Sequence, residues 1–147
     1  MKQKKDPKKE IESAHYLIES ILKIDHTNCQ LIHLKQLLSV LLWKITEANG
    51  KYNLRYVSKG VLVRMQKIKI IHEHVYEREK LINDLISGKK TIQKILENAV
   101  ACLVTVEEAE LLSKVDKKLD GWERYYAARI TVFDKQTLGK KISFDKK

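Results

Sequence analysis

The chain has 147 residues, of which 44% are hydrophobic and 33% are charged, with five Gly and one Pro. This composition is typical of a folded domain, and it excludes collagen-like, disulfide-rich and largely disordered proteins. The 29 Lys and Arg residues outnumber the 19 Asp and Glu residues, so the formal net charge is +10 and favours a polyanionic partner such as nucleic acid.

The surplus of positive charge lies at the two ends of the chain. Residues 1–9 hold five Lys and one Asp, as do residues 135–147, so each end carries +4 and the segment between them only +2. We therefore predict a basic N-terminal arm (1–9), a single globular domain (10–134) and a basic C-terminal tail (135–147). The Lys residues expected to contact nucleic acid are Lys2, Lys4, Lys5, Lys8, Lys9, Lys140, Lys141, Lys146 and Lys147. The alternative is that these Lys residues only keep the protein soluble and contact no partner.

Two features of the sequence bear on the compartment. Cys29 and Cys102 are too few for a disulfide framework, which favours free thiols in a reducing environment. The basic start of the chain is not followed by an apolar leader segment, and the longest apolar run, 37–43, is too short to span a bilayer. We expect a cytoplasmic protein with no membrane partner.

Two helices are expected first. Asp6-Pro7 is typical of an N-cap followed by Pro at the first helical position, and apolar residues then recur at helical spacing to about residue 25. After a turn at 25–28, Leu residues repeat every three or four positions until Asn49-Gly50 ends the second helix. A short turn between two helices predicts an antiparallel hairpin.

The elements expected after residue 50 are short. In chain order they are a strand or extended loop at 51–57, a helix over about 59–66 capped by Ser58, a strand at 67–76, a helix ending at Gly88, a helix capped by Thr91, a buried strand at 99–104, a helix opened by the Thr105/Glu108 capping box, a helix over 122–128 and a strand at 130–133. The sum is an α+β fold, predominantly helical, in which the hairpin packs on a small sheet with short helices.

The segment His72-Glu73-His74 is the strongest candidate for chemistry. Alternate residues of a strand point to the same face, so both imidazoles could bind one divalent metal ion if a carboxylate completed the site. His72, His74 and Glu73 are therefore the candidate catalytic residues, and His72 and His74 the candidate metal ligands. A structural role at the margin of the sheet is the favoured alternative, and no cofactor is predicted.

A second candidate lies on the helix near residue 122. Trp122 and Arg129 belong to an aromatic and basic cluster that could stack on bases and contact phosphates. The alternative is that Trp122 anchors the helix to the core. Glycines occur singly, so no phosphate-binding loop is present, and neither Cys has an activating neighbour in the sequence.

Three segments together carry a resemblance: His72-Glu73-His74-Val75, Thr105-Val106-Glu107-Glu108 and Gly121-Trp122-Glu123-Arg124-Tyr125. The set resembles one found in small uncharacterised bacterial and phage-associated proteins, and it covers roughly residues 58–133. The resemblance points to His72, His74 and Trp122 as residues with a role beyond packing, and it implies no particular activity.

Three functions remain open on the sequence. The leading hypothesis is a non-catalytic cytoplasmic accessory protein that binds nucleic acid non-specifically through its Lys-rich ends. The second is a small metal-dependent hydrolase or nuclease that uses His72 and His74. The third is a protein–protein interaction module that oligomerises through the hairpin, because six Leu residues make a wider apolar stripe than one buried seam needs: Leu31, Leu34, Leu37, Leu38, Leu41 and Leu42.

Overall fold

The structure is a computed structural model that describes residues 5–64, 67–137 and 140–141. The chain forms two compact units, one from Met1–Lys51 and Arg78–Val100 and the other from Tyr52–Glu77 and Ala101–Lys147. We call them the helical unit and the sheet unit. The sequence predicted one domain over 10–134, and the chain passes between the units three times within that range. Each unit is made of two separate segments, so the boundary between the units does not separate two consecutive domains of the chain. That residues 10–134 form a single domain stays a prediction.

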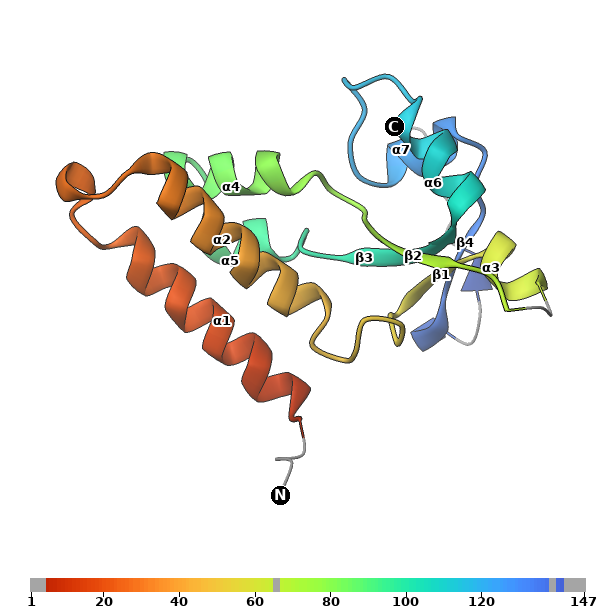
Figure 1. Cartoon of the computed structure of the whole chain (residues 1–147), viewed down its shortest axis with the longest axis horizontal. Helices are drawn as coiled ribbons and strands as arrows, with labels where there is room; N and C mark the ends of the chain where they lie inside the picture. The colour runs from red at the N-terminus through yellow and green to blue at the C-terminus, as the bar shows by residue number, and fades with distance from the viewer. Residues whose placement is uncertain (1–4, 65–66, 138–139, 142–147) are drawn as a thin grey trace. The chain divides into compact units, whose positions relative to one another are not determined.

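The helical unit begins with the two helices expected from the sequence, α1 (Pro7–Leu22) and α2 (Leu31–Thr46). The Asp6 carboxylate accepts hydrogen bonds from the backbone N–H groups of Lys8 and Lys9, which confirms the predicted N-cap. A short 3-10 turn, η1 (His26–Asn28), joins the helices. The two helices contact each other and run in opposite directions (Figure 1).

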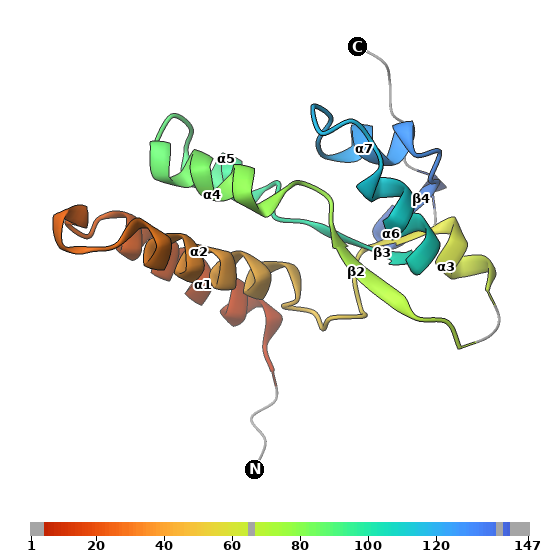
Figure 2. The same cartoon turned by 45° about the horizontal axis from the view of Figure 1, so that its top comes forward.

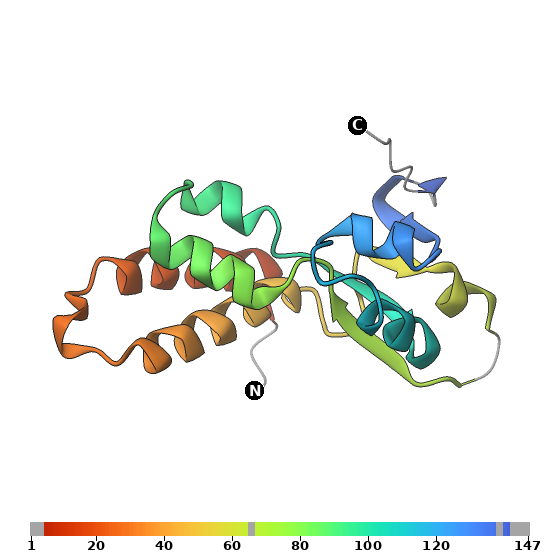
Figure 3. The same cartoon turned by 90° about the horizontal axis from the view of Figure 1, so that it is seen from above.

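Two shorter helices complete this unit. They are α4 (Arg78–Ser87), which contacts both α2 and α5, and α5 (Ile92–Leu96), which is capped by Thr91 as predicted. The core of the unit is made of aliphatic side chains from all four helices: Ala14, Ile18, Leu34, Leu38, Leu42, Leu81, Ile82, Leu85, Ile95 and Leu96. In Figure 3 α4 is drawn across α1, with α5 and α2 to either side.

The sheet unit contains a mixed sheet with the order β2-β3-β1-β4-β5 in the described part of the chain. Its strands are β1 (Tyr56–Ser58), β2 (Ile70–His74), β3 (Ala101–Thr105), β4 (Val132–Asp134) and β5 (Lys140–Lys141). Only β1 and β3 pair in parallel; the other neighbours are antiparallel. The strands predicted at 67–76, 99–104 and 130–133 are confirmed. In the range 51–57, for which a strand or an extended loop was predicted, only Tyr56 and Val57 belong to a strand, the central strand β1, and residues 51–55 form turns and loop.

The predicted basic tail is not wholly separate from the fold. Lys135–Thr137 form the 3-10 turn η2, and β5 pairs with Phe133 and Asp134 of β4. The backbone of β4 offers an edge that the returning chain pairs with. The basic C-terminal tail over 135–147 stays a prediction. Residues 142–147 lie outside the described residues.

Short helices follow the two parallel strands directly. Helix α3 (Lys59–Val63) begins after β1, where the Ser58 hydroxyl accepts the backbone N–H of Val61. Helix α6 (Val106–Ser113) begins after β3 with the predicted capping box of Thr105 and Glu108. With α7 (Trp122–Ala127), α6 lies on one side of the strands (Figure 2). The predicted α+β class with predominant helix is thus confirmed.

The register gives the two faces of the sheet different neighbours. One face carries a buried cluster of Leu54, Val57, Ala101 and Leu103. Because side chains alternate along a strand, Cys102 and Val104 point to the opposite face, where Tyr125 of α7 is fully buried. The two faces of the sheet therefore carry different sets of buried side chains.

Candidate functional site

The two histidines of β2 lie together on one face of the sheet. In the register with β3, His72 is opposite Leu103 and His74 is opposite Ala101. Their ring centroids are 5.4 Å apart and their Nε2 atoms are buried. The prediction that a strand would bring the two imidazoles to one face is therefore correct in its geometry.

The pair offers only two donors to a metal ion. Across residues 5–64, 67–137 and 140–141, no group of three or more His, Cys, Asp or Glu side chains is arranged to hold one. A catalytic zinc site uses three protein ligands and an open position. The hydrolase or nuclease hypothesis therefore stays a prediction that needs a ligand from elsewhere.

Glu73 does not join the histidines. It lies between them on β2 and so points to the other face of the sheet, where Arg124 of α7 donates from Nη2 to Oε1 over 3.2 Å. Arg124 also donates from Nη1 to the backbone carbonyls of His74 and Val75, both over 3.4 Å. The carboxylate is thus part of the contact between α7 and the end of β2. The sequence analysis did not assign this role to Arg124. The alternation of Glu73 with His72 and His74 did indicate that the Glu73 carboxylate lies on the opposite face of the strand and needs a partner there.

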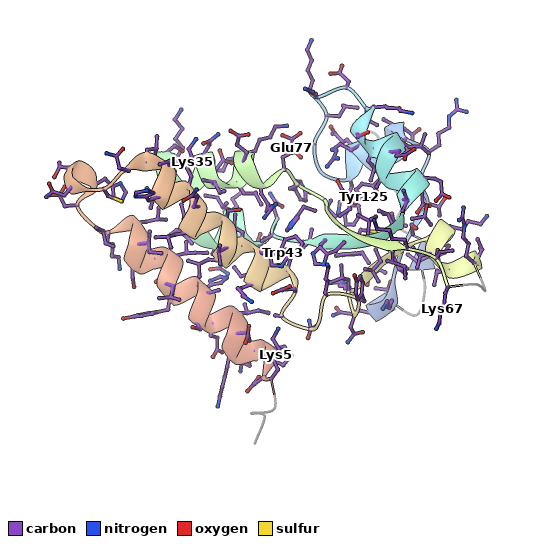
Figure 4. All side chains as sticks on the ribbon, viewed as in Figure 1. Lys5, Lys35, Trp43, Lys67, Glu77 and Tyr125 are labelled. Atoms are coloured by element: carbon purple, nitrogen blue, oxygen red, sulfur yellow. The ribbon has the colours of Figure 1, made fainter. Side chains whose placement is uncertain are left out.

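The face that holds Glu73 also buries a thiol and a phenol. Cys102 and Tyr125 are both fully buried, and Figure 4 labels Tyr125 within the sheet unit. Burial raises the pKa of the Cys102 thiol and the pKa of the Tyr125 hydroxyl well above their ordinary values. Both groups therefore stay protonated at neutral pH, and Cys102 lacks the thiolate that a nucleophile requires.

Glu108 uses its carboxylate to join two helix N-termini. The Ser58 hydroxyl donates to Oε2, the backbone N–H of Thr105 donates to Oε2 over 2.9 Å, and that of Gly60 donates to Oε1 over 3.2 Å. A Cβ on Gly60 would collide with this carboxylate. The sequence indicated the capping box, but the contact with residue 60 needs the parallel pairing of β1 with β3. Three donors within the fold occupy this carboxylate.

The candidate aromatic residue Trp122 is half-buried and packs against two Tyr rings of the sheet unit. Its ring meets that of Tyr56 edge-on at a centroid distance of 4.8 Å, and its centroid is 5.3 Å from that of Tyr125. These contacts match the anchoring role that the sequence left open. Base stacking by Trp122 stays a prediction.

Arg129 has an unusual backbone conformation. It is exposed and has a φ of 57°, the left-handed region that favours glycine. The N–H of Arg129 donates to the carbonyl of Tyr126 over 3.0 Å, and the N–H of Ile130 donates to that of Tyr125 over 2.9 Å. This is the Schellman arrangement at the end of α7, in which glycine usually holds the position that Arg129 holds here.

Arg129 shares a groove with a second cation. The groove has a volume of about 400 Å³, and Lys114 at the end of α6 lines it together with Arg129. Asp116 and apolar side chains, among them Leu111 and Leu119, complete its walls. The tertiary structure thus places a basic pair where the sequence offered Arg129 alone.

The candidate Lys residues are described only in part. Lys5, Lys8 and Lys9 are exposed at the start of α1, where Figure 4 labels Lys5. The backbones of Lys140 and Lys141 form β5. The four remaining candidates lie outside the described residues: Lys2, Lys4, Lys146 and Lys147.

Comparisons with protein-family models, curated proteins and solved structures found no significant match for this chain. None of the helices in the described part of the chain has both the length and the apolar character needed to cross a membrane.

Proposed function

We propose that the protein is a cytoplasmic accessory protein that binds nucleic acid non-specifically and catalyses no reaction of its own. The excess charge lies in residues 1–9 and 135–147 rather than in the nearly neutral segment 10–134. Non-specific binding to nucleic acid rests on contacts between phosphates and Lys or Arg side chains. Two features of the described residues support this proposal.

The first feature is the position of Lys at the start of α1. The N-terminus of a helix carries a partial positive charge, so cations there oppose the helix dipole. Lys5 and Lys8 each lie 3.9 Å from a carboxylate, of Glu10 and Glu12 respectively; Lys8 and Glu12 are largely exposed, and Lys5 and Glu10 are partly exposed. Such pairs add little stability. These Lys residues therefore add little to the stability of α1. Contact with the phosphate groups of a partner explains why Lys is found at this position.

The second feature, which carries the proposal, is Arg129. A left-handed conformation costs a residue with a Cβ about 1 kcal/mol or more compared with glycine. Because strain of this kind is retained where a side chain has a task, the exposed guanidinium of Arg129, which lines one groove with Lys114, is the natural phosphate contact of the sheet unit.

Substitution of Arg129 separates binding from stability. We expect R129G to raise the free energy of unfolding by about 1 kcal/mol, since glycine relieves the strain. The same variant should weaken binding to duplex and single-stranded DNA and reduce the slope of log K against log salt by about one unit. R129Q removes the charge and keeps the strain, so it should weaken binding without the gain in stability. Urea denaturation and fluorescence anisotropy measure the two effects.

The control is K89Q, which removes a positive charge from an exposed Lys in the helical unit. A full-length variant with all five Lys of residues 1–9 changed to Gln tests the N-terminal arm in the same assay. If R129G gains stability and binds as wild type does, Arg129 has no role in binding. If wild type binds neither duplex nor single strands at low salt, the proposed function is wrong.

The metal-dependent hydrolase is the second candidate, favoured by the one observation that His72 and His74 share a face with rings 5.4 Å apart. Zn²⁺ titration followed by calorimetry tests it. A hydrolase predicts stoichiometric binding that is lost in H72A and H74A, whereas a structural pair predicts only a lower melting temperature for both variants.

A further inference from the structure

The groove that Arg129 and Lys114 line in the sheet unit also has an apolar wall. Five of the eight described residues that line it are apolar, and Leu111 of α6 is the most exposed Leu among them, with 48% of its surface open to solvent. All of the lining residues lie between Leu111 and Arg129 in the chain, on α6, on α7 and on the loop that joins them (Figure 2). We call this the α6–α7 groove.

The cations of the α6–α7 groove are open to an anionic ligand. Among the residues that the structure describes, neither Lys114 nor Arg129 takes part in an ion pair. The Asp116 carboxylate also lines the groove, and its Oδ1 accepts the backbone N–H of Lys118 over 2.9 Å. Residues 114–118 and Arg129 together hold four cations and one carboxylate, so the groove favours an anion.

The apolar wall limits which anion fits. An inorganic phosphate ion would contact the two cations but leave Leu111 exposed to water. A nucleotide has both a phosphate and a base with a flat face that packs on other groups. The groove volume of about 400 Å³ is near the lower end of the range for small-ligand sites, about 300–1,000 Å³, which suits one nucleotide.

The same wall distinguishes single strands from duplexes. Inside a duplex the faces of the bases are stacked on one another and cannot reach a protein side chain. In a single strand the bases can be splayed out, and they stack on aromatic rings or on the plane of an Arg guanidinium. An unpaired nucleotide can therefore place its base against Leu111 while its phosphate contacts Arg129, whereas a nucleotide inside a duplex cannot.

We propose that the α6–α7 groove binds one unpaired nucleotide of a single-stranded nucleic acid. Its phosphate lies between Arg129 and Lys114, and its base packs against Leu111. This inference rests on the proposed function, because it uses the same phosphate contact and adds a subsite for the base. The Lys-rich ends contact the phosphates of single and double strands alike. The groove is the part of the protein that tells the two apart.

Fluorescence anisotropy of the full-length chain with three labelled probes tests the groove. The probes are an oligothymidine of about 12 nucleotides, a length within the range of known single-strand sites, the same strand paired with oligoadenosine, and a strand of equal length whose sugars all lack bases. We expect wild type to bind the strand without bases about fivefold more weakly than oligothymidine. L111S should lose about fivefold in affinity for oligothymidine and bind the other two probes as wild type does.

The matched control is L62S, which makes the same change at a Leu of α3 that is 56% exposed and lies outside the groove. It should bind all three probes as wild type does, and urea denaturation should show that both variants fold. The comparison of the two single strands on wild type requires no variant, so it decides the question even if L111S is destabilised.

Three results would overturn the base subsite. They are an L111S variant that binds oligothymidine as wild type does, one that loses affinity for oligothymidine and the duplex alike, and a wild type that binds the strand without bases as tightly as oligothymidine. In each case, salt-dependent binding of wild type to the probes leaves the proposed function intact. A wild type that binds none of the probes at low salt overturns the proposed function and the base subsite together.

Discussion

At the scale of single residues, Arg55 and Asp134 form an ion pair with two hydrogen bonds in the sheet unit. Arg55 donates from Nε over 2.8 Å and from Nη2 over 2.6 Å to the two carboxylate oxygens of Asp134. The backbone N–H of Gln136 also donates to Asp134, over 2.9 Å. The hydrogen bond from Arg55 is the largest cause that lowers the pKa of Asp134 below its ordinary value. The pair joins the chain before β1 to the end of β4.

This ion pair makes stability depend on pH. Because the folded pKa of Asp134 is lowered, its contribution is fully present above the unfolded pKa of about 3.9 and is lost as the pH falls through the folded value. We expect D134N to lower the free energy of unfolding by about 1–2 kcal/mol at pH 7, and the difference from wild type to shrink below about pH 4. Urea denaturation across this pH range measures both.

Asp84 provides the control for that prediction. Its carboxylate lies 2.7 Å from the Lys90 ammonium, but both side chains are well exposed. Exposed pairs contribute about 0–1 kcal/mol. D84N should therefore change stability little at either pH, and an equal loss in D84N and D134N would contradict the role given to Arg55.

At the scale of elements, Glu108 connects the N-terminus of α6 with that of α3. Ser58, Gly60 and Thr105 all donate to its carboxylate, so one side chain satisfies backbone groups after both parallel strands. The absence of a side chain at Gly60 leaves the space in which this carboxylate lies. The two helices are thus positioned by one shared acceptor.

A double-mutant cycle tests this connection. We expect G60A and E108A each to lower the free energy of unfolding by about 1–3 kcal/mol, the first through the collision and the second through lost hydrogen bonds. The double variant should lose less than the sum, because E108A removes the group that the new Cβ would strike. G88A is the control: it has a φ of +64° and open space around it, so its cost should be the same with or without E108A. Additive losses in G60A/E108A would contradict the shared acceptor.

At the scale of the whole molecule, each unit is assembled from two separate segments of the chain. The helical unit needs α4 and α5 from Arg78–Val100, and α4 contacts α2. The buried side chains of α4, Leu81, Ile82 and Leu85, belong to the core of that unit. The hairpin of α1 and α2 alone is therefore an incomplete core.

A fragment of residues 1–51 tests this dependence. Without α4 and α5, part of the apolar seam of α2 becomes exposed to water, at a cost of about 25 cal/mol per Å² of apolar surface. We expect the fragment to lose its helical signal gradually on heating, whereas the full-length chain should melt cooperatively. Circular dichroism at 222 nm measures both. A fragment that melts as sharply and as high as the full chain would contradict this view of the unit.

The local elements could be predicted from the sequence because their determinants are local. Asp6, Ser58, Thr91 and Thr105 cap the helices that the sequence assigned to them. A side-chain cap involves residues two or three positions apart, so it can be recognised without knowledge of the fold. The β5 pairing was missed because its two Lys residues carry no apolar pattern and join the sheet only through their backbone.

The candidate site could be predicted only in part. The sequence places His72 and His74 on one face of a strand, and the alternation that does so also removes Glu73 from them. What holds Glu73 is Arg124, which is distant in the sequence and close only because α7 packs over β2. Likewise, a basic pair of Arg129 and Lys114 requires the ends of α6 and α7 to line one groove.

The sequence alone determined the charge of +10 and its concentration at the two ends, the helical caps and the α+β class, since all of these follow from composition and short-range spacing. The tertiary structure decided the strand order, the left-handed Arg129 and the shared carboxylate of Glu108. These features depend on contacts between residues far apart in the chain. Such contacts are selected by the packing of the whole fold and leave no short-range pattern in the sequence.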